Sequence, residues 1–409
     1  MSDPSVNNVT AFDFTPAASK VTQFRRDHRL SIINAIRSAA LCGLLAVLVF
    51  CIFHYQEDLN IENMRRMVAY IDKLSFSGGE IDTFTFDAGL STAYESFDVG
   101  IATISGGSFR FIPPFEGMDY TEQVKYSQPQ LEPGGKSMFV YDLGGKGITR
   151  MSSYSKLAET TLESKILSLA AGDNGRCAVI TDEEGYRTAL TVFDKHFKEI
   201  YKWQTSEHFA FLSALSSDGR TAAVLCIGQA RGDANFYIRY QPLNGDECTV
   251  TIEMGDRRVY AMKYWNDSLL VLCEDGLYAY NEEGESTGGY LFASGSLTTF
   301  AYGHDGCFAL SLKGDRGDTS RLLVLDAACA VAFDGTFDGD IRTIDYAEGT
   351  LALLSGSQLY RADISAGTIQ NTELSGVRDV LITGGGNVAA VLGDCARIVD
   401  FTEGEQPQK

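Results

Sequence analysis

A weak internal repeat downstream of residue 80 constrains the fold more than any other feature of this sequence. In each copy a short polar turn precedes an apolar stretch, and the turns recur every 37 to 48 residues. A degenerate copy near Ser96 brings the number of copies to eight. A steady period of this size is typical of proteins built from repeated supersecondary units. The turn markers are Gly135, Gly175, Gly219, Asp267, Gly306, Gly349 and Gly386.

Each copy contains the pattern of four short strands. In one copy they fall at 209–215, 221–227, 236–241 and 249–253, separated by turns rich in Gly, Asp and Asn. Four strands in about 40 to 45 residues is the size of a β-propeller blade. We therefore predict an all-β, eight-bladed β-propeller, with seven blades as the alternative. The last copy has three strands, and 80–87 is expected to supply the fourth and close the ring.

A charge-free segment precedes the repeats. Residues 38–56 contain no Asp, Glu, Lys or Arg, and this length suits a helix that crosses a bilayer. No small-x-small cleavage site follows it, which favours an uncleaved signal-anchor over a secretory signal. The residues before it are mainly basic and those directly after it are acidic. The positive-inside rule then predicts a cytoplasmic N-terminus, a single pass through the cell membrane and an extracellular C-terminal domain.

These features predict five regions. They are a cytoplasmic tail over 1–37, a transmembrane signal-anchor helix over 38–56, a juxtamembrane helix and linker over 57–79, the propeller over 80–403 and a polar tail over 404–409.

This layout resembles that of a known family. The stalk sequence ENMRRMVAYID at 62–72 and the stretch CAVITDEEGYRTALTVFD at 177–194 carry the likeness, together with the basic tail and the single apolar segment. The chain is similar to a family of uncharacterised, single-pass, membrane-anchored β-propeller proteins of Gram-positive bacteria. The resemblance implies the anchor and the fold, and it implies no activity.

Charge and composition exclude some classes of function. The formal net charge is −20, and phosphate binding needs a basic surface, so we expect no nucleic-acid partner. The repeat length is WD40-like, but the sequence has only two Trp and no Trp-Asp pair. Seven of the nine Cys lie outside the apolar segment, so at least one of these seven thiols is unpaired.

The sequence holds no motif that nominates a reaction. It contains no CxxC pair, no HExxH and no GxSxG, and its five His form no cluster with Cys. We accordingly predict no catalytic residue, no metal site and no cofactor.

One periodic feature suggests a ligand site. A basic residue lies near the start of the first strand in most copies, seven to eleven residues before the turn marker. In a propeller these positions surround one mouth of the central channel, where positive charge would attract an anion. The competing interpretation is that they are solvated strand ends, neutralised by neighbouring acidic residues. The six residues are Lys125, Lys165, His208, Arg258, Arg342 and Arg378.

The leading functional hypothesis is a membrane-tethered, extracytoplasmic propeller that acts as a non-enzymatic interaction or sensing module and binds an envelope protein. Propellers expose large faces built from loops, and the fold alone assigns no chemistry. The alternatives are an envelope enzyme, either a glycan hydrolase or a lyase, and an anion-binding module with its site at the propeller mouth.

Overall fold

The computed structural model describes residues 28–54, 82–86, 92–114, 119–230, 233–245, 247–248, 250–303, 305–314, 319–384 and 386–401. The chain divides into two compact units, Met1–Leu59 and Asn60–Lys409. The cytoplasmic tail predicted over 1–37 lies largely outside the described residues. The juxtamembrane region predicted over 57–79 and the polar tail predicted over 404–409 lie outside them entirely.

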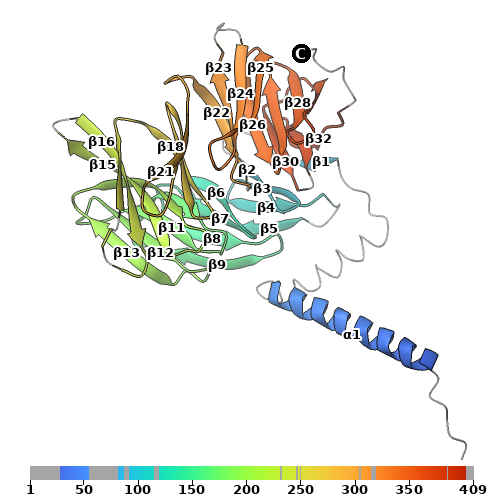
Figure 1. The fold of residues 1–409 in the computed structure, drawn as a ribbon. Coiled ribbons are helices and arrows are strands. Elements are labelled where there is room, and N and C mark those ends of the chain that lie inside the picture. Colours follow the sequence, from blue (N-terminus) through green and yellow to red (C-terminus); the bar gives the residue numbers. More distant parts are fainter. Residues whose placement is uncertain are drawn as a thin grey trace, which may run out of the picture. The chain divides into compact units, whose positions relative to one another are not determined.

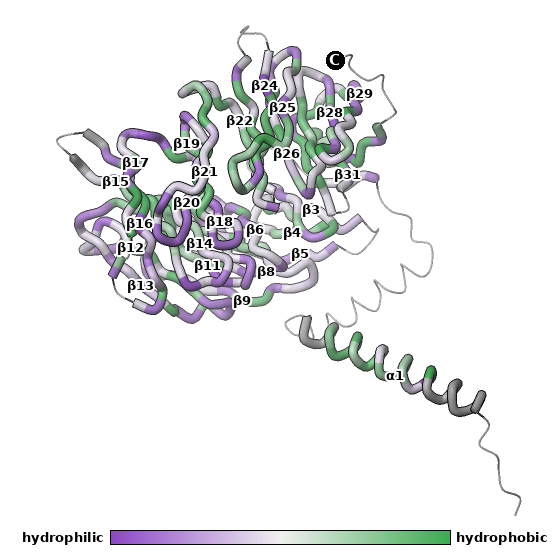
Figure 2. The backbone as a smooth tube through the Cα atoms, viewed as in Figure 1, coloured by the Kyte–Doolittle hydropathy of each residue, from purple (hydrophilic) through white to green (hydrophobic). Residues whose placement is uncertain are grey.

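The first unit contains one helix, α1 (His28–His54). Its described side chains, at 36–50, are all exposed. They are mostly apolar, as the green stretch of the tube in Figure 2 shows. Within the part of the chain that the structure describes, no helix combines the length and the apolar character needed to cross a bilayer. The transmembrane helix predicted over 38–56 is therefore not supported by the structure.

The second unit is an eight-bladed β-propeller, which confirms the predicted fold and shows that the seven-bladed alternative was wrong. Every blade is a four-stranded antiparallel sheet (Figure 1). Blade 1 comprises β2 (Ala93–Phe97), β3 (Gly100–Ser105), β4 (Ser108–Ile112) and β5 (Tyr120–Gln123). Blade 2 comprises β6 (Pro129–Gly134), β7 (Ser137–Asp142), β8 (Gly147–Met151) and β9 (Lys156–Thr161). Blade 3 comprises β10 (Lys165–Ala171), β11 (Cys177–Asp182), β12 (Thr188–Phe193) and β13 (Glu199–Thr205).

Blade 4 comprises β14 (Phe209–Leu215), β15 (Thr221–Ala230), β16 (Asp233–Pro242) and β17 (Val250–Gly255). Blade 5 comprises β18 (Val259–Trp265), β19 (Ser268–Cys273), β20 (Gly276–Tyr280) and β21 (Ser286–Leu291). Blade 6 comprises β22 (Leu297–Tyr302), β23 (Phe308–Lys313), β24 (Thr319–Leu325) and β25 (Val331–Asp338). Blade 7 comprises β26 (Ile341–Ala347), β27 (Thr350–Ser355), β28 (Gln358–Asp363) and β29 (Thr368–Glu373).

Blade 8 is shared between the two ends of the propeller. It comprises β30 (Asp379–Thr383), β31 (Asn387–Val391), β32 (Cys395–Ile398) and β1 (Thr83–Thr85). The register pairs Phe84 of β1 with Ala396 of β32, and the Phe84 side chain is fully buried. This pairing confirms that 80–87 supplies the missing strand, and it removes the free edge that β32 would otherwise expose.

Eight apolar clusters hold the blades together, one at each interface between neighbouring blades. The second strand of each blade lies between two such clusters. In blades 5 and 7, for example, five consecutive residues of β19 and of β27 are buried. These second strands are the continuous apolar stretches of the repeat, because a strand covered on both faces carries no polar side.

The repeat markers occupy the tight turns between the first and second strands. Asp267 lies in a turn whose left-handed residue is its neighbour Asn266. The six marker glycines, which all have positive φ, are Gly135, Gly175, Gly219, Gly306, Gly349 and Gly386. A left-handed backbone is strained for most side chains and readily adopted by Gly and Asn, which explains the composition of the markers.

All eight first strands begin on one side of the ring, which we call the leading face. The connections between second and third strands and the ends of the fourth strands lie on this same face, because successive strands of a blade are antiparallel. The tight turns with the repeat markers lie on the opposite side, which we call the trailing face. The first strands contact one another around the centre of the ring.

The cysteines whose side chains the structure describes are all free thiols. Cys177 and Cys226 are fully buried in second strands, where a thiol packs as a small apolar group.

Candidate functional site

The six basic residues that the sequence singles out all lie on the leading face. They are Lys125 between β5 and β6, Lys165 at the start of β10, His208, Arg258 and Arg378 directly before β14, β18 and β30, and Arg342 as the second residue of β26. His208 is half-buried, and the other five side chains are exposed.

At least two of these arginines extend over their own blades. The Arg342 guanidinium donates to the carbonyl of Gly356, which lies in the turn between β27 and β28. The Arg378 guanidinium lies beside the connection between β31 and β32, since a methyl group at Gly393 would be 3.4 Å from Arg378 Nη2. The structure thus places the six residues on one face, and their joint action on an anion stays a prediction.

The first strands of blades 3 to 7 share a β-bulge near their start. The register of β18 skips Tyr260, and the other bulged residues are Leu167, Phe211, Thr298 and Arg342. A bulge bends its strand and turns a side chain out of the regular alternation. Tyr260 is 42% exposed as a result, and Phe209, at the start of the neighbouring first strand, is 40% exposed.

A pocket of about 400 Å³ opens on the leading face of blade 4. It contains one of the six predicted residues, His208, and side chains from β16 and β17. The lining residues are Glu207, His208, Gly228, Asn235, Tyr237, Arg239, Thr251 and Glu253.

His208 forms the centre of a compact group of side chains in this pocket. Its Nδ1 lies 2.5 Å from Tyr237 Oη, and its Nε2 lies 3.5 Å from Arg239 Nη1. The imidazole stacks on Trp203 of blade 3, with 6.2 Å between the ring centroids. Arg239 Cζ lies 5.4 Å from the centroid of the same indole, within the range of a cation–π interaction.

The surroundings keep both His208 and Tyr237 uncharged near neutral pH. Burial, and then the Arg239 guanidinium, lower the pKa of His208 below its ordinary value. Burial raises the pKa of Tyr237 to about 12. A neutral imidazole beside an arginine avoids the repulsion between two half-buried cations.

A second group of charged residues lies where the first strands meet. Four charged residues occupy equivalent positions in the first strands of blades 1, 2, 5 and 7. Each lies two residues before the last first-strand residue that pairs with the second strand, and a two-residue turn follows that pair. The four are Glu95, Glu132, Lys263 and Asp345. We call these four residues the inner charged ring. The sequence carries a signal for their equivalence, a charge three residues before the turn, but these four residues are not among the predicted site residues.

The inner charged ring connects distant parts of the chain. Lys263 Nζ donates to Glu132 Oε1 at 3.2 Å, which links blades 5 and 2. Asp345 accepts a hydrogen bond from the backbone N–H of Ile382 at 2.6 Å. Next to Glu95 in the sequence, Tyr94 of blade 1 donates from its Oη to Asp379 Oδ2 of blade 8 at 3.0 Å. Three carboxylates therefore share the ring with one ammonium group.

Glu95 is the member of the ring with the most perturbed protonation. Burial raises its pKa to about 8, and the carboxylates of Asp345, Glu132 and Asp379 contribute in the same direction. Glu95 is therefore mainly protonated at pH 7, which relieves the repulsion among the acidic side chains.

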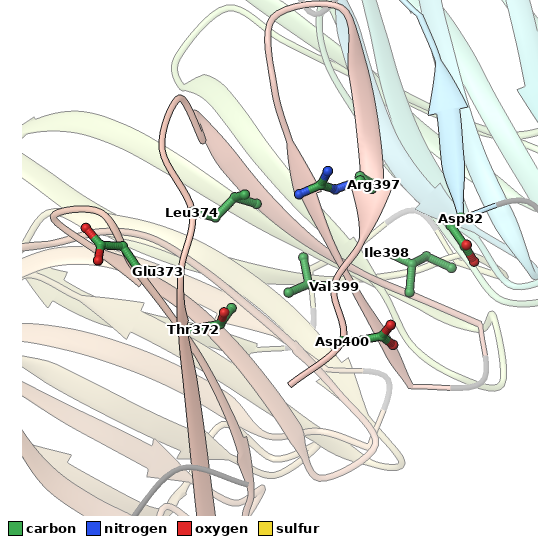
Figure 3. Close-up of a pocket in the computed structure, with 8 residues that line it drawn as sticks. All are labelled: Asp82, Thr372, Glu373, Leu374, Arg397, Ile398, Val399 and Asp400. Atoms are coloured by element: carbon green, nitrogen blue, oxygen red, sulfur yellow. The ribbon is translucent and has the colours of Figure 1, made fainter. Parts of the chain in front are cut away.

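A third site lies at the closure of the ring, where a pocket of about 360 Å³ separates β29 from β1 and β32. Figure 3 shows Arg397 between Leu374 and Asp82 in this pocket. The other lining residues are Thr372, Glu373, Ile398, Val399 and Asp400. Among the residues that the structure describes, no group of three or more His, Cys, Asp or Glu is arranged to hold a metal ion.

The comparisons with known proteins identify the family. Residues 80–392 match the profile of a family of unknown function, DUF5711. The chain belongs to this family. No curated protein matches it.

Solved structures share the fold at low sequence identity. BamB from Moraxella catarrhalis is 12% identical, with a TM-score of 0.50 over 80% of this chain and 99% of that chain. The C-terminal WD40 domain of Sif2 is 13% identical, with a TM-score of 0.55 over 79% of this chain and 98% of that chain. A eukaryotic initiation factor is 12% identical, with a TM-score of 0.52 over 77% and 84%. At this level of identity the likeness establishes the propeller fold alone.

Proposed function

We propose that this member of DUF5711 is a non-enzymatic interaction module at the cell envelope, and that it contacts a partner protein through the leading face of blades 3 to 5. The observation that carries the proposal is a group of exposed, large apolar side chains on this face: Tyr186, Phe209, Tyr260 and Leu291. The described part of the propeller has three other such side chains, Val99, Ile200 and Val331. These lie at strand ends of the trailing face, in blades 1, 3 and 6.

This arrangement favours a protein partner. Aromatic side chains contribute much of the binding energy in protein interfaces, and apolar side chains gathered on one face of a soluble domain mark interaction sites. The four residues come from three consecutive blades, so one partner surface can reach them together. The His208 pocket opens on the same face, next to Phe209 in the sequence, and adds polar groups to it.

Attachment to the membrane, with the N-terminus in the cytoplasm and the propeller outside, is part of the proposal. It rests on the absence of charge over 38–56 and on the basic residues before this segment. Carbonate extraction of cell membranes, followed by protease treatment of intact cells, tests it. A chain released by carbonate, or a propeller protected from protease on intact cells, contradicts this part of the proposal.

The Tyr237–His208 pair is the observation that favours the alternative of a glycan lyase, because such a pair can transfer protons. Both ring nitrogens of His208, however, face protein groups rather than open space. Neither nitrogen is free to take a proton from a substrate in this arrangement, and we therefore favour the interaction module.

Affinity purification after cross-linking in intact cells tests the interaction surface. The leading-face variant carries Tyr186→Ser, Phe209→Ser, Tyr260→Ser and Leu291→Ser. The matched control carries Val99→Ser, Ile200→Ser and Val331→Ser on the trailing face. We expect a partner to be recovered with the wild type and the control and lost with the leading-face variant. Equal recovery with both variants would contradict the proposal.

A further inference from the structure

Arg239 differs from three other half-buried arginines of the propeller. Arg110, Arg257 and Arg321 each form an ion pair with an Asp. Arg239 has no carboxylate within salt-bridge distance among the described residues, and its Nε is buried without a hydrogen-bond acceptor. A guanidinium has five N–H donors and no acceptor, so Arg239 still has a donor available for an anionic ligand.

The neighbouring side chains in the pocket add further donors. Arg239 cannot accept a hydrogen bond, so His208 Nε2 is the acceptor in their contact and His208 Nδ1 carries the proton. Nδ1–H then donates to Tyr237 Oη, and the Tyr237 hydroxyl hydrogen is left to point elsewhere. Asn235, Tyr237 and Arg239 alternate along β16, so all three lie on the same face of the strand.

The two acidic residues of the pocket do not compete strongly for this guanidinium. Glu253 already accepts a hydrogen bond from Asn235 Nδ2 at 2.9 Å. The Glu207 side chain is 86% exposed, so water screens its charge. Arg239 is therefore the charged group that a ligand meets in the interior of the pocket.

A glycine leaves space for a ligand in the pocket, and an unpaired strand edge lies beside it. Gly228 lies across the ladder from Asn235, and a methyl group there would come within 3.2 Å of the Tyr237 ring. The β15–β16 ladder extends from Gly228–Asn235 to Ala230–Asp233, beyond the last pairs with β14 and β17. This extension is a two-stranded ribbon whose outer edges have no ladder partner among the described residues.

We propose that the His208 pocket binds a carboxylate of an extended acidic segment of the partner, with Arg239 as the charged contact. The inference rests on the proposed function and specifies the chemistry of the partner. The ribbon edge favours a peptide over a free small acid, because an extended segment can add backbone hydrogen bonds to an unpaired strand. Phe209, next to His208, offers an apolar contact for a neighbouring side chain of the same segment.

The first test uses the two tryptophans of the full-length chain, labelled with 5-fluorotryptophan and purified in detergent. Propionate, titrated at constant ionic strength, is expected to shift the fluorine resonance of Trp203 and to leave that of Trp265 unchanged. Propionamide, which has the same shape without the charge, is expected to shift neither. The absence of a Trp203 shift, or an equal shift with propionamide, would overturn the assignment of the pocket to a carboxylate.

Two charge-matched variants identify the residue responsible. Arg239→Gln is expected to weaken propionate binding about tenfold or more, because it removes a charge-assisted hydrogen bond. Arg220→Gln, on the trailing face with an 83% exposed side chain, is expected to leave binding unchanged. Matched melting temperatures would show that both variants fold. A Trp203 shift that persists in Arg239→Gln would refute the role of this arginine.

A second test separates a peptide from a small acid. A peptide of alternating Val and Glu is expected to bind at least about tenfold more tightly than propionate, and its Val and Gln counterpart is expected to lose this gain. Equal affinities for the Glu peptide and propionate would overturn the assignment to a partner segment. If neither probe binds while the cellular partner is still recovered, the pocket assignment fails and the proposed function stands. If the probes bind and the leading-face variant still recovers the partner, the proposed function fails.

Discussion

Replacing Glu95 by Gln should remove a pH dependence from the stability of the propeller. Glu95 has its pKa raised from 4.5 to about 8 in the folded chain, by burial and by the carboxylates around it. The folded state therefore holds this proton more tightly than the unfolded state. The contribution of Glu95 to stability is highest below pH 4.5, decreases as the pH rises toward 8, and then levels off.

The size of the effect follows from the shift. At 1.36 kcal/mol for each pKa unit, the total loss is about 5 kcal/mol, and about 2 kcal/mol of it falls between pH 6 and pH 8. Gln has nearly the same shape as a protonated Glu and cannot ionise. The variant should differ from the wild type by less than about 1 kcal/mol at pH 5 and exceed its stability by most of the total at pH 9.

Urea denaturation of the two proteins at several pH values between 5 and 9 measures this difference. Glu159→Gln is a suitable control, because Glu159 is a surface residue paired with Lys156 and its side chain is 54% exposed. The control should follow the wild-type pH profile, since exposed ion pairs contribute little to stability. Parallel profiles of the wild type and Glu95→Gln between pH 6 and pH 9 would refute the reasoning about Glu95.

Two further predictions test the inner charged ring and the closure of the propeller. Lys263→Met removes the ammonium group that pairs with Glu132 and that, in the wild type, lowers the pKa of Glu95. We therefore expect urea denaturation to show a loss of stability of about 1 to 3 kcal/mol, and the Glu95 transition to move to higher pH. An unchanged transition would contradict the role of Lys263 in the inner charged ring. Phe84→Ala empties a fully buried position in the strand that closes blade 8, and it should cost about 3 to 5 kcal/mol, whereas a cost below 1 kcal/mol would show that β1 does not secure the closure.

The sequence determined the architecture because the repeat signal comes from packing that is the same in every blade. The second strands are covered on both sides, so their apolar stretches stand out at a regular spacing. The turn markers need left-handed backbone, so Gly and Asn recur there. Closure by 80–87 followed from counting strands in the last copy.

The sites were harder to predict because each depends on departures from the repeat. Trp203 and Arg239 lie on different blades, and only the packing of blade 3 against blade 4 brings them together. Tyr260 is exposed because of a bulge that has no simple sequence signature. The position of His208 near a strand start predicts its place on the leading face, but spacing along the chain does not reveal its contact with Tyr237.

Site-specific photo-cross-linking in living cells tests the interaction surface most directly. A benzophenone amino acid replaces Tyr260 on the leading face in one strain and Ile200 on the trailing face in another; these side chains are 42% and 37% exposed. The proposed function predicts a covalent adduct with a partner protein at position 260 and none at position 200. The same adduct at both positions, or an adduct at position 200 alone, would contradict the assignment of the leading face as the contact surface.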